Sequence, residues 1–183
     1  TSAILEKLNN SNAEIGISVN WPNLIGQEAC CLFQHGILNA HAGDLPRYRG
    51  NACPNWAILN SEEKIALSIH QIDPHGLDTG DIILKKYFPL NSGIYIEDVY
   101  AWLRDIIPSA FCEAIGAIKN NASVSVPQSL DTSESLRCYP RRPEDGKINW
   151  EDKARDIHAL IRASSHPFAG AFCFMENGEK III

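Results

Sequence analysis

The sequence predicts an α/β fold: a Rossmann-like, mostly parallel sheet with flanking helices, followed by a small C-terminal helix and hairpin region. Two observations carry this prediction. A short apolar run at 15–19, a helix-compatible stretch at 27–34 and a second apolar run at 36–38 follow in the order typical of a parallel βαβ unit. At 65–70, Ile, Leu and Ile alternate with Ala, Ser and His, which is the period of a strand.

Three further elements extend the main sheet and its helices. Residues 51–59 have a helical pattern, and Pro54 stands in the first turn, where proline is tolerated. A strand is expected at 82–88 and a long helix at 96–118, with Pro108 breaking or kinking that helix.

The domain organisation follows from changes in composition. We expect a main domain at 1–120, a linker at 121–136 and a C-terminal subdomain at 137–183, because the middle segment is polar and lacks periodicity. The chain opens without an apolar first strand and stops inside the run 181–183. We therefore expect a fragment that lacks its leading strands and is truncated at its C-terminal end.

The C-terminal subdomain contains a helix signal and a hairpin signal. Asn149 is expected to cap a helix in which Trp150 joins the buried face. Asn177 and Gly178 stand between two apolar runs, and this dipeptide is typical of a tight hairpin turn.

Charge and composition limit the classes of partner. With 16 basic residues against 22 acidic ones, and a net charge of -6, the chain has no large basic surface, so we expect no nucleic-acid partner. A local pair such as Arg47 and Arg49 can still hold a phosphate. Six cysteines form no CxxC pair, which favours reduced thiols in the cytoplasm. No apolar run approaches the roughly 20 residues that span a bilayer, so we expect no membrane partner.

The first cluster of chemically useful residues lies at 38–50. If a parallel strand ends near Leu38, Asn39 and His41 lie at its carboxyl end, where open α/β sheets bind ligands, and their spacing points both side chains the same way. An Asn amide can donate to a developing oxyanion, and a His can transfer a proton near neutral pH. The pair suits acyl-type transfer, although Asn-x-His alone is more often an ordinary strand end.

The second cluster lies at 70–81. Gly76 and Gly80 allow sharp turns, so Asp78 can be presented from a loop between two strands. A carboxylate beside an imidazole raises its basicity and orients it. Alone, such a turn is more often a pair of solvated acids. A metal site built from His41, His70, His75 and Asp78 is disfavoured, because the spacing matches no standard ligand set.

Together the two clusters resemble the folate-dependent formyltransferases. The resemblance rests on Asn-x-His at 39–41, Leu-Pro-x-x-Arg-Gly at 45–50 and Gly-Leu-Asp-Thr-Gly at 76–80, and it continues through 56–58, 145–150, 160–163 and 167–172. It implies that 1–120 is the catalytic core, that 10-formyltetrahydrofolate is the donor without a metal, and that Asn39, His41 and Asp78 are catalytic. Asp44 departs from the family's usual pattern, and the sequence does not explain its role.

The same resemblance implies the binding residues. Folate contacts are expected in two segments of loop character, at Asn20, Trp21, Ile72, Asp73, His75 and Gly76. Contacts with the acceptor substrate are expected at Arg47, Tyr48, Arg49 and Trp56. As alternatives, Trp56 is a core residue of its helix and Arg49 a solvated loop charge.

Three acceptors fit the family: methionyl-tRNA, glycinamide ribonucleotide and a nucleotide-linked amino sugar. The segments 41–43, 54–56 and 140–146, together with His70, resemble most closely the sugar N-formyltransferases of lipopolysaccharide and O-antigen precursor biosynthesis, such as those acting on dTDP-4-amino-4,6-dideoxyhexoses. We therefore expect a nucleotide-linked amino sugar as the acceptor. A methionyl-tRNA formyltransferase and a formyltetrahydrofolate deformylase remain as alternatives, and the oligomeric state, a homodimer included, is open.

Overall fold

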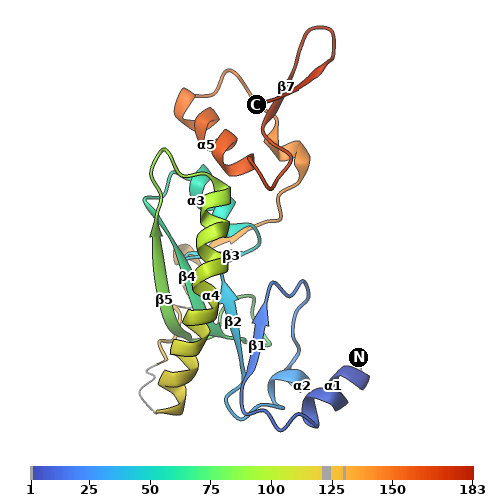
Figure 1. Cartoon of the computed structure of the whole chain (residues 1–183), viewed down its shortest axis with the longest axis vertical. Coiled ribbons are helices and arrows are strands. Elements are labelled where there is room, and N and C mark those ends of the chain that lie inside the picture. The colour runs from blue at the N-terminus through green and yellow to red at the C-terminus, as the bar shows by residue number, and fades with distance from the viewer. Residues whose placement is uncertain (1, 121–124, 130) are drawn as a thin grey trace.

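The computed structural model describes residues 2–120, 125–129 and 131–183. It has a central sheet with helices on its faces, and a C-terminal unit lies at one end of the elongated molecule (Figure 1). The elements in chain order are α1 (Ser2–Asn9), β1 (Gly16–Val19), α2 (Gln27–Cys30), β2 (Ile37–His41), β3 (Tyr48–Gly50), α3 (Cys53–Leu59), β4 (Lys64–Gln71), β5 (Ile82–Pro89), α4 (Ile96–Lys119), η1 (Thr132–Glu134), β6 (Leu136–Cys138), η2 (Pro143–Gly146), α5 (Ala154–Ser164), β7 (Phe172–Phe174) and β8 (Lys180–Ile182).

The main sheet has the strand order β1-β2-β4-β5, and the α/β fold class is confirmed. The predicted βαβ unit is present: β1 and β2 pair in parallel, from Gly16 opposite Ile37 to Val19 opposite Ala40, although α2 between them is only 4 residues long. The other two pairings, β2 with β4 and β4 with β5, are antiparallel. Within the main sheet the parallel pair is β1 with β2, and the loop at 72–81 returns the chain beside β4 in the opposite direction. A second parallel pair, β3 with β6, forms a separate two-stranded sheet.

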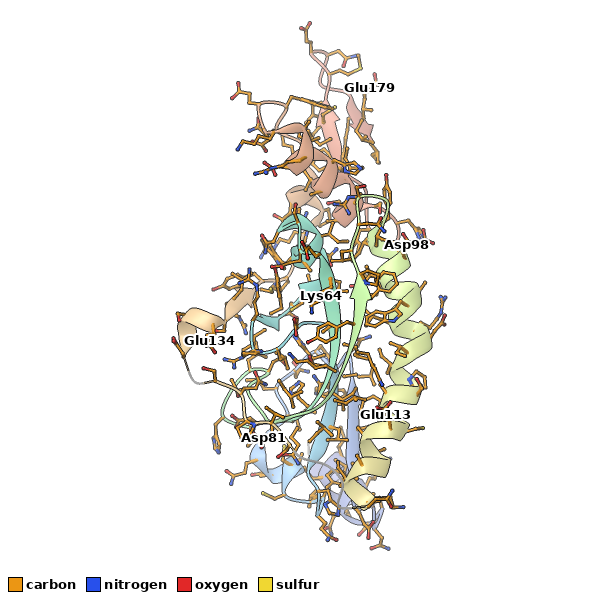
Figure 2. All side chains as sticks on the ribbon, turned by 90° about the vertical axis from the view of Figure 1, so that its left-hand side faces the viewer. Lys64, Asp81, Asp98, Glu113, Glu134 and Glu179 are labelled. Carbon is orange, nitrogen blue, oxygen red and sulfur yellow. The ribbon has the colours of Figure 1, made fainter. Side chains whose placement is uncertain are left out.

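The central strand β4 is buried on both faces, including the two polar positions of its alternating pattern. Ser68 and His70 are 0% and 1% exposed. Helix α4 packs against β4 and β5 (Figure 2), and the segment after β2 lies against β4 through a 2.7 Å hydrogen bond from Ser68 Oγ to the Gly43 carbonyl. Buried polar groups need partners, so His70 must find its own within the interior.

Helix α4 runs unbroken past Pro108, so the expected break does not occur. Pro108 lies at an exposed position, where water can satisfy the carbonyl that the missing N–H leaves free. The helix begins with a capping box, in which Asp98 Oδ2 accepts from Tyr95 N at 2.8 Å. Within the part of the chain that the structure describes, no helix is both long and apolar enough to cross a bilayer.

The C-terminal unit confirms the hairpin and corrects the start of the helix. Strands β7 and β8 pair antiparallel around the predicted turn. Helix α5 begins at Ala154, because Asn149 instead closes a local turn: its Oδ1 accepts from Glu151 N at 3.2 Å and its Nδ2 donates to Asp152 Oδ1 at 2.9 Å. Trp150 is consequently 62% exposed and does not join a buried helix face.

Hydrogen bonds to main-chain carbonyls attach this unit to the core. Arg162 of α5, 7% exposed, donates from Nη1 to the carbonyls of Asn91 and Ile94 at 3.1 and 2.9 Å. Asn55 of α3 donates to the Ala163 carbonyl at 2.8 Å. The orientation of α5 is therefore set by polar contacts with the loop before α4 and with α3.

We predict that Arg162→Gln destabilises the protein, because the shorter neutral side chain leaves both carbonyls without their charged donor. The expected loss is about 2 kcal/mol in the free energy of unfolding, measured by urea denaturation. Arg155→Gln on the same helix is the matched control, since the Arg155 side chain is 74% exposed, and we expect a change below about 0.5 kcal/mol. Equal unfolding midpoints for the two variants would contradict this assignment.

Candidate active site

Two neighbouring strands bring Asn39, His41 and His70 to one place. Asn39 and His41 are alternate residues at the end of β2, and the β2–β4 register sets Asn39 opposite His70. The rings of His41 and His70 meet edge to face with their centroids 6.0 Å apart. Both side chains lie beside His70, so Asn39 and His41 point the same way, as predicted.

Asp78 reaches these residues from the loop between β4 and β5. Its backbone is left-handed, with φ of 54°, and its Oδ2 accepts a 2.8 Å hydrogen bond from Gly50 N. Oδ2 also lies 3.6 Å from His41 Nδ1, while Oδ1 lies 3.7 Å from His70 Nε2. The carboxylate therefore lies between two imidazoles, at distances that suit electrostatic attraction or a bridging water more than direct hydrogen bonds.

The ring of His41 faces an oxygen at each nitrogen. Nε2 lies 2.7 Å from the Tyr48 carbonyl, which can only accept, so this nitrogen carries a hydrogen. A side chain at Gly43 would place its Cβ 2.5 Å from the same nitrogen, so glycine is needed there. Nδ1 remains directed toward Asp78 and the cleft, where it accepts a proton in the neutral ring and donates one in the doubly protonated ring.

His70 has the opposite character. Burial, and next the charge of His41, lower the pKa of His70 to about 4, so its ring is neutral near pH 7. Because Nδ1 donates to the Gln71 carbonyl at 2.7 Å, Nε2 is free to accept from Asn39 Nδ2 at 3.1 Å. This bond orients the Asn39 amide and leaves its second N–H for a ligand.

Two spaces meet at these residues. A small pocket of about 90 Å³ is lined by Asn39, His70 and Asp78 together with parts of the loops at 21–25 and 72–77. A larger cleft of about 940 Å³ is lined by Asn39, His41 and Asp78, the segments 19–24 and 50–54, and one side of α4. Asn39 and Asp78 therefore border both spaces.

The predicted folate residues are divided between the two spaces. Asn20 and Trp21 line the cleft, and Trp21 also lines the small pocket. Ile72, Asp73 and Gly76 line the small pocket. His75 is exposed and lines neither space, because the turn it belongs to directs its main-chain N–H to Asp73 Oδ1 at 2.9 Å.

The four residues predicted to contact the acceptor are not among the residues that line the cleft. Arg47 pairs with Glu62 at 2.9 Å, and the Tyr48 hydroxyl, on a residue only 3% exposed, donates to the same carboxylate at 2.7 Å. Arg49 donates to Gln128 at 2.9 Å. Trp56 donates from Nε1 to the Tyr139 carbonyl at 2.9 Å, so each of these four side chains has a partner within the protein.

Sequence reasoning missed the residues that hold Asp78. Gln128 lies in the segment interpreted as a linker, yet it is buried and donates to the carbonyls of Asp78 and Gly80 at 2.9 and 2.6 Å. A polar segment without periodicity contains no signal for such a contact. The structure also explains Asp44, whose Oδ1 lies 2.6 Å from Lys85 Nζ on β5, and Lys85 also donates to the Leu45 carbonyl.

No group of three or more His, Cys, Asp or Glu residues is arranged to hold a metal ion within the described parts of the chain. Cys53 lies close to the site, with Sγ 3.7 Å from His41 Nε2. Its contact with Cys138 and its burial raise the pKa of Cys53, so it remains a neutral thiol.

Comparison with known proteins defines the family. The model described as Formyl transferase matches residues 1–115, and the model described as Formyl transferase, C-terminal domain, matches residues 141–183. This chain belongs to the formyl transferase family.

Individual relatives differ in their acceptors. The methionyl-tRNA formyltransferase of Thermodesulfovibrio yellowstonii is 32% identical over 98% of this chain and 56% of its own length. The chain spans about half the length of the curated relatives it matches. An N-formyltransferase from Helicobacter canadensis, solved with folinic acid and dTDP-3-aminofucose, is 28% identical with a TM-score of 0.67, covering 80% of this chain and 53% of that one.

The fold itself is shared with a 4-N formyltransferase from Francisella tularensis. That structure has a TM-score of 0.78 at 23% identity, and the match covers 98% of this chain and 74% of the other. The similarity therefore includes both the sheet and the C-terminal unit.

The lowered pKa of His70 predicts an acid-sensitive fold. Between about pH 6.5 and pH 4 the unfolded chain takes up a proton at this histidine that the folded chain excludes, so stability falls as the pH drops through that window. The expected loss between pH 7 and pH 5 is about 2 kcal/mol in the free energy of unfolding, measured by urea denaturation at the two pH values.

His70→Asn is expected to reduce that pH dependence, whatever its own stability at pH 7. His158→Asn, at an exposed position on α5, is the control and should keep the full dependence. A His70 variant with an unchanged slope would show that another group causes the acid sensitivity.

Proposed function

We propose that the protein transfers the formyl group of 10-formyltetrahydrofolate to an amine. The observation that carries this proposal is the meeting of two spaces at Asn39 and Asp78. A group-transfer enzyme must bring donor and acceptor together at its catalytic residues, and two spaces that share those residues meet that requirement. Membership of the family supports the same reaction.

The donor folate is proposed to place its ring system in the small pocket. Main-chain groups of 72–76 and the exposed Trp21 ring, 56% accessible, offer hydrogen bonds and a stacking surface there. The carbonyl to be attacked then lies near Asn39, and the acceptor enters through the larger cleft.

The residues of the site have distinct parts in the reaction. The acceptor nitrogen bonds to the formyl carbon, and negative charge develops on the formyl oxygen. The free Asn39 N–H and, in the doubly protonated imidazole, the His41 Nδ1–H are placed to donate to that oxygen. Asp78 takes the proton that the acceptor nitrogen loses, directly or through water, and delivers it to the folate nitrogen as the bond from the formyl carbon to that nitrogen breaks.

His70 acts in this scheme as a positioning residue. Its neutral ring accepts from the Asn39 amide, so the amide cannot rotate and present its oxygen to the developing oxyanion. A charged His70 would lose that acceptor. Burial therefore maintains the donor geometry near neutral pH.

For the acceptor we propose a nucleotide-linked amino sugar. Support comes from the segments that resemble sugar enzymes and from the structural similarity to an N-formyltransferase that was solved with dTDP-3-aminofucose. Methionyl-tRNA is the second candidate, because the 32% identical relative from Thermodesulfovibrio yellowstonii bears that name. The net charge of -6 favours the smaller acceptor.

Turnover with defined acceptors tests the proposal. Tetrahydrofolate release is measured with 10-formyltetrahydrofolate and dTDP-, UDP- or GDP-linked amino sugars, with methionyl-tRNA, and with no amine. We expect release with at least one amino sugar. Release without any amine would indicate a deformylase, and release with methionyl-tRNA alone would replace the sugar acceptor.

Asp78→Asn tests the assigned proton acceptor. Its side chain keeps the shape and can still accept from Gly50 N, but it is a poor base, so kcat should fall by about 100-fold or more while the protein stays folded. Asp105→Asn, on the exposed side of α4, is the matched control and should retain full turnover. Near-normal turnover of the Asp78 variant would remove this residue from the mechanism.

A further inference from the structure

The segment 125–129 is attached to the loop that carries Asp78. Ile82 and Val126 exchange two main-chain hydrogen bonds of 2.9 Å each. This contact brings Gln128, which is 9% exposed, against the turn between β4 and β5. A buried amide in that position needs partners for both its oxygen and its nitrogen.

The partners of Gln128 allow only one orientation of its amide. Arg49 donates from Nε and Nη2 to Gln128 Oε1 at 3.3 and 2.9 Å. On the other side, Gln128 Nε2 donates to the main-chain carbonyls of Asp78 and Gly80 at 2.9 and 2.6 Å. Because a guanidinium only donates and a carbonyl only accepts, a rotated amide would set nitrogen against nitrogen and oxygen against oxygen. Arg49 therefore determines that Gln128 presents its donors to the Asp78 loop.

The Asp78 loop needs these donors because of its backbone conformation. Asp78 has a left-handed backbone, with φ of 54°, which is unfavourable in a residue other than glycine and persists where surrounding contacts require it. The Gln128 amide binds the carbonyls on either side of Thr79, and thereby fixes the peptide unit that follows Asp78. Loss of that amide would let the unit rotate and turn the carboxylate away from Gly50 N and His41.

Neither Arg49 nor Gln128 is placed to touch a substrate. The two residues are not among those that line the small pocket or the larger cleft. Arg49 also donates to the Ser129 carbonyl at 3.3 Å, so three hydrogen bonds join its guanidinium to the segment 125–129. Any effect of the two residues on turnover is therefore expected to pass through the Asp78 loop.

We propose that Arg49 and Gln128 are positioning residues: Arg49 orients the Gln128 amide, and this amide maintains the loop conformation in which the Asp78 carboxylate meets the acceptor amine. This inference rests on the proposed formyl transfer, and it gives Arg49 a part in the reaction different from the acceptor contact that the family resemblance implied. Displacement of a catalytic group by about 1 Å lowers turnover by about 100-fold, so hydrogen bonds outside the site are sufficient to control it.

Gln128→Glu separates positioning from substrate binding. The carboxylate keeps an acceptor for Arg49, but it has no donor for the two loop carbonyls and repels them. With an acceptor that is formylated in the turnover assay, kcat should fall by about tenfold or more, while the KM values of donor and acceptor change less than about threefold. Gln34→Glu, the same change at an exposed position, is the matched control and should retain full turnover. An unchanged kcat in the Gln128 variant would overturn the inference.

Arg49→Met should give the same pattern, because the Gln128 amide then loses the donors that orient it. We expect kcat to fall by about fivefold or more with a nearly constant KM for the acceptor. Arg155→Met on α5 is the control, since the Arg155 side chain is 74% exposed. A rise in the acceptor KM at unchanged kcat would contradict the inference, because Arg49 would then bind the acceptor itself.

Combination with Asp78→Asn distinguishes positioning from a general loss of stability. If Gln128 acts through the Asp78 carboxylate, Gln128→Glu should lower the remaining turnover of the Asp78→Asn variant by less than about twofold. A further loss of about tenfold in that background would overturn the inference, because the substitution would then impair the site by another route.

Hydrogen exchange tests the loop without any need for turnover. Gly50 N donates to Asp78 Oδ2, so release of the carboxylate exposes this amide to exchange with solvent. In NMR measurements, Gln128→Glu should accelerate exchange at Gly50 by about tenfold or more and leave the amides of β4 unchanged, whereas Gln34→Glu should alter neither. Equal Gly50 exchange rates in the two variants would refute the positioning role of Gln128.

The two kinds of measurement separate the inference from the proposed function. If the chain formylates an amine and Gln128→Glu changes neither kcat nor Gly50 exchange, the positioning role is wrong and the function stands. If Gly50 exchange responds as expected and no amine is formylated, Gln128 holds the loop as inferred and the proposed function is wrong.

Discussion

The carboxylate of Asp78 is the point on which the rest of the site depends. A main-chain N–H from Gly50, after β3, binds it at 2.8 Å, and Gln128 binds the carbonyls on either side of Thr79. Two residues that are distant in sequence from the Asp78 loop, Gly50 and Gln128, thus determine where the Asp78 side chain lies. Because Asp78 adopts a left-handed backbone, its loop needs this external support to keep the carboxylate directed inward.

The carboxylate lies between the rings of His41 and His70, which have different hydrogen-bond partners. His41 faces Asp78 through Nδ1 and the Tyr48 carbonyl through Nε2, so both of its nitrogens have oxygen partners. His70 is almost fully buried, and its low pKa keeps it neutral and able to accept from Asn39. Both rings are buried, so the contrast arises from their different hydrogen-bond partners.

The arginine side chains differ in whether the fold supplies them with hydrogen-bond or ion-pair partners. Arg47, Arg49 and Arg162 are held by a carboxylate, an amide and two carbonyls, respectively. Arg137 lines the larger cleft beside the Tyr139 ring, and no carboxylate of the residues that the structure describes forms an ion pair with it. Availability for binding therefore depends on which partners the fold supplies, and the identity of the residue alone does not reveal it.

The sequence by itself determined the α/β class, the βαβ unit of β1 and β2, the strands β4 and β5, the C-terminal hairpin, and the grouping of Asn39, His41 and Asp78. Those features depend on local periodicity, on turn residues and on motif spacing, all of which are written in short stretches of chain. Tertiary structure alone decided that α4 passes Pro108, that α5 begins at Ala154 and not after Asn149, and that Arg49 pairs with Gln128 while Arg137 lines the cleft. Each of these depends on a partner far away in the sequence or on solvent exposure, and neither can be seen in a local pattern.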